Sequence, residues 1–187
     1  MKKYILFAGV NGAGKSTLYQ SQTFNPTVQR INTDEIIREF GKWYNPPDII
    51  AAGKIVIKRF GEYIENGITF SQETTLCGKS ILKNIQRAKK EGYLIEMHYV
   101  GVDSVEIAKE RIKKRVENGG HGIPDKDVER RYIASFENLR QVMEDIDLVA
   151  FYDNTETFRR IAIYRKGSIV RLSKTVPFWF EKYVLDE

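Results

Sequence analysis

The sequence has a single cysteine, Cys77, and only two histidines among its 187 residues. One cysteine excludes an internal disulfide and favours a reducing compartment, so we expect a cytoplasmic protein. Because thiol and imidazole ligands are so few, we expect no dedicated zinc site. Long apolar runs are also absent. None approaches the roughly 18 residues of a membrane span, so we expect no membrane partner.

The sequence also lacks the Asn-Lys-x-Asp motif with which switch GTPases read their base, and it has no repeats. No run alternates basic with aromatic residues, which speaks against a nucleic-acid partner. The net charge of +5 fits anionic partners such as nucleotides or phosphorylated sugars. The length and the ordinary share of 42% hydrophobic residues predict one domain that spans residues 1–187.

Apolar patterns and turn residues predict strands that alternate with helices almost throughout the chain. The expected strands are 3–8, 27–32, 68–74, 93–102 and 148–153, and the expected helices are 32–41, 46–67, 78–91, 104–118 and 125–145, besides one that begins at Lys15. Residues 158–173 predict a hairpin that turns at Lys166 and Gly167, and residues 178–180 predict a tail anchored on the core. We therefore expect an α/β fold with a mostly parallel sheet of five or six strands flanked by helices, and a C-terminal β-hairpin.

Residues 9–16 hold a complete P-loop pattern, in which Gly9 and Gly14 enclose four residues and Lys15 and Ser16 follow. Glycines let backbone N–H groups surround phosphates, Lys15 can bridge the terminal phosphates, and Ser16 can hold Mg²⁺. We expect a P-loop NTPase or kinase fold with ATP and Mg²⁺ as cofactors. The expected metal ligand is Ser16, and the expected nucleotide contacts in the loop are Asn11, Gly12, Ala13, Gly14, Lys15, Ser16 and Thr17.

Two acids follow predicted strands, where ligands of a parallel sheet usually bind. Asp34 follows the second strand and Glu73 follows the third. A short α/β chain with a P-loop favours a small-molecule kinase, in which a carboxylate must orient the acceptor hydroxyl. The alternatives are a helix-start carboxylate at Asp34 and a solvated loop acid at Glu73. Thr75 can bind substrate or cap the next helix.

Residues 103–131 hold a basic helix, a Gly-Gly-His-Gly turn and the start of a second helix. Helical spacing places Arg111, Arg115 and Arg131 beside the apolar stripes of these helices, with His121 in the turn between them, whereas Arg130 points away. Cations brought over a triphosphate neutralise charge in phosphoryl transfer, so this region is a candidate lid. A solvated pair of basic helices is the alternative.

The motifs together resemble those of the zeta toxin family of P-loop kinases. The resemblance covers about residues 4–155 and runs through "FAGVNGAGKSTL", "INTDEI", "FSQETTL", "GGHGIP", "VERRYIASFENL" and "FYDNT". The P-loop alone is unspecific, but the turn "GGHGIP" followed by "VERRY" is much more specific. Founding members of that family phosphorylate UDP-N-acetylglucosamine at its 3′-hydroxyl, so the resemblance implies a small hydroxyl acceptor. If the protein is a toxin of this kind, the resemblance also implies an antitoxin partner.

The resemblance implies a role for each matching residue. Lys15, Asp34, Arg115 and Arg131 would be catalytic, with Asp34 as the base on the acceptor hydroxyl. Glu73, Thr75 and His121 would contact the substrate, with Glu73 also near Mg²⁺. Arg111 and Asn154 would contact the nucleotide. Either Arg111 or Arg115 matches one phosphate-binding arginine of the toxins, and the sequence does not choose between them.

The sequence departs from the toxins at His121, where a second phosphate-binding arginine would fall, and Arg131 is the candidate replacement. Chloramphenicol phosphotransferases share the layout more distantly, so another small metabolite stays open as the acceptor. A nucleic-acid 5′-hydroxyl kinase and a nucleotide-binding module without turnover are further alternatives. Trp43, which follows Asp34, can stack on a base or sugar, although loop packing is the simpler interpretation.

Overall fold

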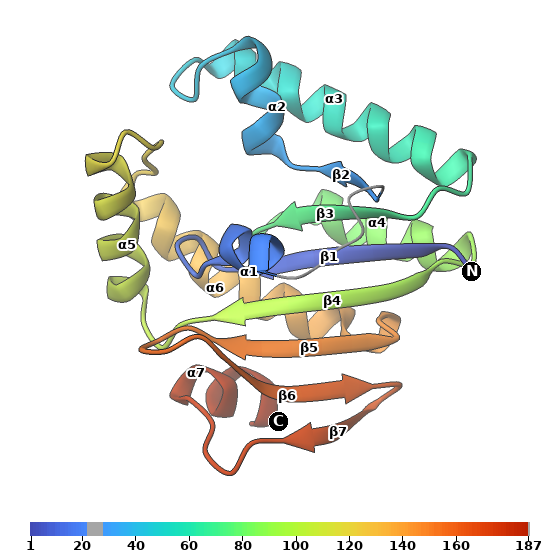
Figure 1. Ribbon diagram of the computed structural model, residues 1–187, viewed down its shortest axis with the longest axis vertical. Helices are drawn as coiled ribbons and strands as arrows, with labels where there is room; N and C mark the ends of the chain where they lie inside the picture. The colour runs from blue at the N-terminus through green and yellow to red at the C-terminus, as the bar shows by residue number, and fades with distance from the viewer. Residues whose placement is uncertain (22–27, 187) are drawn as a thin grey trace.

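The computed structural model describes residues 1–21 and 28–186, and its central feature is one seven-stranded sheet (Figure 1). The strands lie in the order β2-β3-β1-β4-β5-β6-β7. Their bounds are Lys3–Gly9 (β1), Gln29–Ile31 (β2), Phe70–Thr74 (β3), Leu94–Gly101 (β4), Leu148–Asp153 (β5), Arg159–Arg165 (β6) and Ser168–Leu172 (β7). The first five strands in this order from the β2 edge are parallel, which confirms the predicted α/β fold.

The C-terminal hairpin continues the sheet. Its first strand, β6, pairs antiparallel with β5, and β7 pairs antiparallel with β6. The sheet is therefore larger than the five or six strands expected, because the hairpin joins it edge to edge. Thr27, which the sequence assigned to the second strand, lies outside the described residues.

The helices cover both faces of the sheet and stand beyond its edges (Figure 1). Their bounds are Lys15–Ser21 (α1), Thr33–Phe40 (α2), Pro46–Glu65 (α3), Lys79–Lys90 (α4), Val105–Glu117 (α5), Asp125–Val142 (α6) and Phe178–Phe180 (α7), with short turns at Met143–Asp145 (η1) and Glu181–Leu185 (η2). The helix predicted over 125–145 is α6, which ends at Val142 and is followed by the short turn η1. None of the helices in the described part of the chain combines the length and apolarity needed to cross a bilayer.

The core lies between the sheet and its helices, and the C-terminal tail completes it. Trp179 and Phe180 are fully buried, which confirms the predicted anchoring of 178–180. Trp179 packs so closely on Gly101 at the end of β4 that a Cβ there would overlap the indole ring. Phe136 of α6 stacks on both Trp179 and Tyr183. The tail is therefore part of the structure beneath the carboxyl ends of the strands.

Candidate functional site

The glycines of the loop after β1 have backbone conformations that residues with side chains rarely adopt. Gly9, Gly12 and Gly14 have φ angles of 135°, 74° and 100°, in the region that favours glycine. A Cβ at Gly9 would overlap the carbonyl oxygen of Val100, and one at Gly12 would lie 2.8 Å from that of Ala108. The sequence therefore uses glycine here because β4 and α5 leave no room for a side chain.

Lys15 begins α1 and is held inside the loop. Its side chain is buried, and Nζ donates a hydrogen bond to the carbonyl of Val10 over 3.0 Å. Burial lowers the pKa of the Lys15 ammonium, while the carboxylates of Glu73 and Asp34 oppose that shift. The loop thus presents a buried cation whose charge two neighbouring carboxylates help to stabilise.

Glu73 is fixed next to the P-loop from several sides. Its Oε1 accepts a hydrogen bond from Ser16 Oγ over 2.8 Å. Its Oε2 accepts bonds from Arg30 Nη2 over 2.8 Å and from Asn32 Nδ2 over 3.1 Å. The register explains this position, because Glu73 lies opposite Phe7 near the end of β1. A hydroxyl and a carboxylate therefore meet at the entrance to α1.

Arg30 was missed by the sequence analysis, although it organises this carboxylate. Besides Glu73 it pairs with Glu35 over 2.8 Å, and its guanidinium lies 3.6 Å from the ring centre of Tyr19. Only 16% of its side chain is exposed. The available signal was its place in a short strand that leads directly into Asn32 and Asp34.

Asp34 lies in the first turn of α2, close to the P-loop and Glu73. The helix begins there because Asn32 caps it and accepts a hydrogen bond from the Asp34 backbone N–H. Burial raises the pKa of the Asp34 carboxyl, and the Glu73 charge raises it further, whereas Lys15, Arg115 and Arg38 lower it. A carboxylate whose proton affinity is increased in this way has the property that a general base needs.

His121 reaches Asp34 from the turn between α5 and α6. Its Nε2 lies 3.7 Å from Asp34 Oδ2, and its ring stacks on Trp43 with centroids 4.0 Å apart. Burial and the charges of Arg115, Arg38 and Arg131 lower the pKa of His121 to about 4. The imidazole is therefore neutral at pH 7, and its contact with Asp34 is not an ion pair. Trp43 packs on the turn between α5 and α6, which agrees with loop packing, the simpler interpretation of this residue.

Arg111 and Arg115 of α5 have buried guanidinium donors that lack acceptors among the described residues. Arg111 Nη2 donates to the carbonyl of Thr155 over 3.1 Å, but its Nη1 has no acceptor in the described part of the chain. Arg115 Nε and Nη2 are also buried without an acceptor among the described residues. Burial lowers the pKa of Arg115, and the carboxylates of Asp34 and Glu73 oppose that shift.

These buried donors test whether the site fits a triphosphate. A buried guanidinium N–H without an acceptor is costly, and phosphate oxygens are acceptors that match it. Among the described residues, the buried polar groups without a partner include the donors Arg111 Nη1, Arg115 Nε and Arg115 Nη2, and one acceptor of the P-loop, the amide oxygen of Asn11. The three arginine donors are the groups that match phosphate oxygens. The residues present therefore fit a bound polyphosphate.

Mg²⁺ needs hard oxygen ligands and commonly takes only one or two from the protein. Ser16 Oγ and Glu73 supply such oxygens beside the loop. Within residues 1–21 and 28–186, no group of three or more His, Cys, Asp or Glu side chains is placed to hold a metal. The donor set therefore fits a magnesium ion whose remaining ligands come from phosphates and water.

The other expected site residues lie at the margins. Asn154 donates to the carbonyl of Ala13 over 2.8 Å, so it braces the P-loop. Thr75 Oγ1 lies 2.9 Å from Cys77 Sγ. Arg131 lies near enough to lower the pKa of His121, whereas Arg130 is 63% exposed and pairs with Asp127. Thr17 is exposed on α1. Arg38, which faces Asp34 and His121, was missed by the sequence analysis.

Comparisons with known proteins agree with this architecture. Residues 5–139 match the family described as AAA domain. The chain is similar to an uncharacterized protein of Haemophilus influenzae, with 37% identity over 132 residues that make up 70% of this chain and 92% of that protein.

Solved structures share the fold at low sequence identity. The AvrRxo1-ORF1:-ORF2 complex with ATP matches with a TM-score of 0.71 and 13% identity over 98% of this chain and 63% of that one. The PezAT toxin–antitoxin system of Streptococcus pneumoniae matches with a TM-score of 0.59 and 18% identity over 84% of this chain and 69% of that one. The Pnkp1/Rnl/Hen1 RNA repair complex matches with a TM-score of 0.59 and 22% identity over 75% of this chain and 46% of that one. The chain thus spans less than two thirds of the AvrRxo1 chain it matches.

Proposed function

The chain belongs to the AAA domain family, and from that premise we propose that it is an ATP-dependent kinase of the zeta toxin type. It would transfer the γ-phosphate of ATP to a hydroxyl of a small acceptor, with UDP-N-acetylglucosamine as the first candidate. The observation that carries the proposal is the placement of Asp34, a carboxylate of raised pKa in the first turn of α2, close to the P-loop cation Lys15. The P-loop kinase-like fold and its nucleotide-binding loop provide the setting.

The basic residues would bind and orient the donor. Lys15 lies inside the loop, and Arg111 and Arg115 offer buried donors without acceptors in the described residues. Phosphate oxygens would take up these donors and relieve the cost of burying them. The arginines would also neutralise charge that spreads over the transferred group. Arg131 would add charge from the start of α6, beside His121.

Ser16 and Glu73 would hold Mg²⁺, which when bound neutralises phosphate charge and aligns the phosphoryl group. Arg30 and Asn32 fix the Glu73 carboxylate, so its free orientation is limited. Thr75 follows Glu73 at the end of β3, where the proposal assigns it to the acceptor.

Asp34 would act as the base in the transfer step. Its carboxylate takes the proton of the acceptor hydroxyl while the acceptor oxygen bonds to the γ-phosphorus. The bond from that phosphorus to the bridging oxygen breaks, and ADP leaves. Neutral His121, 3.7 Å from Asp34 Oδ2, would contact the acceptor rather than carry charge.

The neighbouring structures support two further parts of the proposal. ATP is present in the AvrRxo1 complex, which supports ATP as donor. PezAT is a toxin–antitoxin system, which supports an antitoxin protein as partner of this chain.

Phosphorus NMR with Mg-ATP and UDP-N-acetylglucosamine tests the proposal on the wild-type protein and Asp34→Asn. We expect a new sugar-phosphate resonance from wild type, and a rate reduced by about 10²- to 10⁴-fold in the variant, because a general base contributes that much. ATP binding, measured by calorimetry, should be retained. The variant should also melt at or above the wild-type temperature at pH 7, since a raised carboxyl pKa means that ionised Asp34 opposes folding there.

The outcomes separate the parts of the proposal. ADP production without a sugar phosphate would reject this acceptor and keep the kinase. Equal rates in wild type and Asp34→Asn would reject Asp34 as base. ATP binding without turnover on any hydroxyl acceptor would favour a nucleotide-binding module.

A further inference from the structure

The C-terminal hairpin concentrates positive charge away from the P-loop. Between Glu156 and Glu181 the sequence contains no acidic residue but six basic ones, namely Arg159, Arg160, Arg165, Lys166, Arg171 and Lys174. This segment contains β6 and β7, at the edge of the sheet farthest from β2. Such a local excess of one sign attracts partners of the opposite sign.

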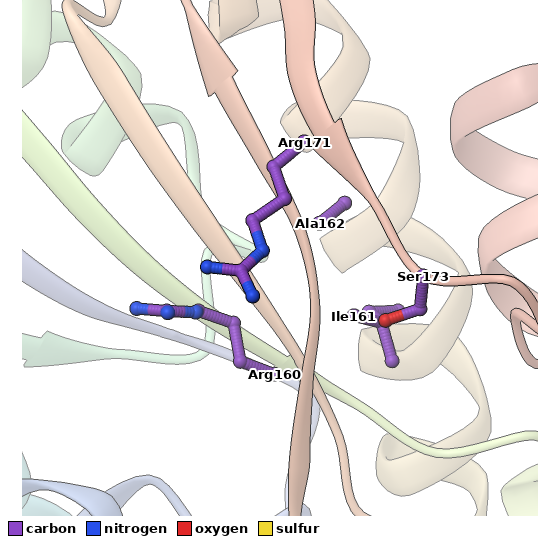
Figure 2. A pocket seen from close by; sticks show the side chains of 5 residues that line it. All are labelled: Arg160, Ile161, Ala162, Arg171 and Ser173. Carbon is purple, nitrogen blue, oxygen red and sulfur yellow. The ribbon is translucent and has the colours of Figure 1, made fainter.

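Two of these arginines line one pocket on the hairpin. The pocket has a volume of about 130 Å³ and is lined by Arg160, Ile161, Ala162, Arg171 and Ser173. Figure 2 shows the Arg160 and Arg171 side chains extending from their strands toward the same side of the pocket. Neither guanidinium has a carboxylate partner within residues 1–21 and 28–186. Two like charges that share a pocket favour an anion between them.

β7 is an edge strand with exposed apolar side chains. Among the described residues it pairs only with β6, so the backbone N–H and C=O groups on its other side have no strand partner in that part of the chain. Val170 is 58% exposed and Leu172 is 49% exposed, and they flank Arg171 along the strand. Charges or proline on an edge discourage strand addition, and β7 carries one charge, Arg171, between two exposed apolar side chains. An added strand is therefore favoured when it brings an acidic side chain to Arg171.

We propose that β7 docks an acidic, extended segment of a partner protein. The segment pairs with β7 as an added strand, and its apolar side chains contact Val170 and Leu172. One of its carboxylates binds between Arg160 and Arg171, where a fork of donors matches a carboxylate. This site is independent of the proposed kinase reaction, since it shares no residue with the P-loop region.

Other occupants fit this surface less well. A second copy of the chain would bring another hairpin that has basic but no acidic residues between Glu156 and Glu181, and like charges across paired strands are unfavourable. Single-stranded nucleic acid needs exposed aromatic rings on which bases stack. β7 itself carries no aromatic residue and presents Val170 and Leu172, and Phe158, although 40% exposed, already stacks on Tyr152 with ring centroids 5.6 Å apart.

Fluorescence anisotropy with a labelled peptide of about six residues, in which glutamate alternates with valine, tests the proposal. A second peptide carries proline at alternate positions, which removes the N–H donors along one edge of the peptide strand. We expect saturable binding of the first peptide, and binding at least about tenfold weaker for the proline peptide and for Arg160→Gln/Arg171→Gln. Glutamine keeps the exposed side chains long and polar, and a melting curve checks that the variant is folded.

The matched control is Lys83→Gln/Lys90→Gln, which removes two exposed charges from α4. It should bind the peptide within about twofold of wild type at 0.15 M salt, where distant surface charges are screened. Equal losses in the two double variants would overturn the proposal, as would equal binding of the two peptides. A labelled oligothymidine that binds tighter than the peptide and depends on Arg160 and Arg171 would also overturn it, in favour of nucleic acid.

Discussion

At the scale of single residues, neighbouring charges set the proton affinity of Asp34. Burial and Glu73 raise its pKa, while Lys15, Arg115 and Arg38 lower it. The base is the ionised carboxylate, so kcat/KM should fall as the pH drops through this raised pKa. Arg38→Gln removes one charge that lowers the pKa, and the acid limb of the profile should therefore move to higher pH. Measuring kcat/KM against pH for wild type and Arg38→Gln checks this.

Arg59→Gln is the control for that experiment. Arg59 lies on α3 and pairs with Glu39 over 3.6 Å, so its loss should leave the acid limb in place. An acid limb that stays fixed in Arg38→Gln, or that moves to lower pH, would contradict the electrostatic account of Asp34.

The sequence predicted single residues well where a motif or strand end marked them. Lys15, Ser16, Asp34, Glu73 and His121 were expected near one another, and the structure brings them together, although their roles stay predictions. Arg30 and Arg38 were not predicted. Arg30 gains its importance from Glu73, which is distant in sequence and becomes its neighbour only when β2 pairs with β3.

At the scale of elements, the turn between α5 and α6, which belongs to the candidate lid, contacts the loop between α2 and α3. The contact is the stack of the His121 ring on the Trp43 ring. Trp43→Ala removes its stack on His121, which is worth about 0.5–1.5 kcal/mol. Because the stack holds the turn beside Asp34, we expect KM for the acceptor to rise about 2- to 10-fold, with a smaller change in kcat. Steady-state kinetics with varied acceptor measure both constants.

Tyr44→Ala is the matched control, because Tyr44 is adjacent in sequence but 79% exposed. Its kinetic constants should stay within about twofold of wild type. An unchanged KM in Trp43→Ala, or an equal rise in Tyr44→Ala, would show that the stack does not position the lid turn.

Most helices and strands could be predicted, because period and capping residues are local signals. Pro46 at the start of α3 and Ser104 before α5 are examples. Two features could not. The antiparallel pairing of β6 with β5 joins the hairpin to the parallel sheet, and the strand pattern of each segment does not specify its neighbour. The contact of His121 with Trp43 joins segments that are remote in sequence. Neither leaves a periodic pattern.

At the scale of the whole molecule, stability depends on the tail that packs under the sheet. Trp179→Ala should lower the free energy of unfolding by about 3–5 kcal/mol, because the indole is fully buried and its removal leaves a cavity. The variant also loses the hydrogen bond from Trp179 Nε1 to Asp153 Oδ1. Urea denaturation followed by circular dichroism measures the change.

Phe178→Ala is the control, since Phe178 is 60% exposed beside Trp179. Its free energy of unfolding should change by less than about 1 kcal/mol. Similar losses in the two variants would mean that the tail is held by its exposed face rather than by the buried indole.

The packing of Trp179 against Gly101 has a consequence for the order of synthesis. The indole also bonds to Asp153, whose neighbour Asn154 braces the P-loop through Ala13. On the ribosome, β1 to β5 emerge well before Trp179, and domains fold as their segments emerge. The support beneath the nucleotide loop is therefore completed only after the tail has left the exit tunnel. A nascent chain stalled before that point would hold every P-loop residue and Asn154, but it would lack the indole that bonds to Asp153 and packs on Gly101.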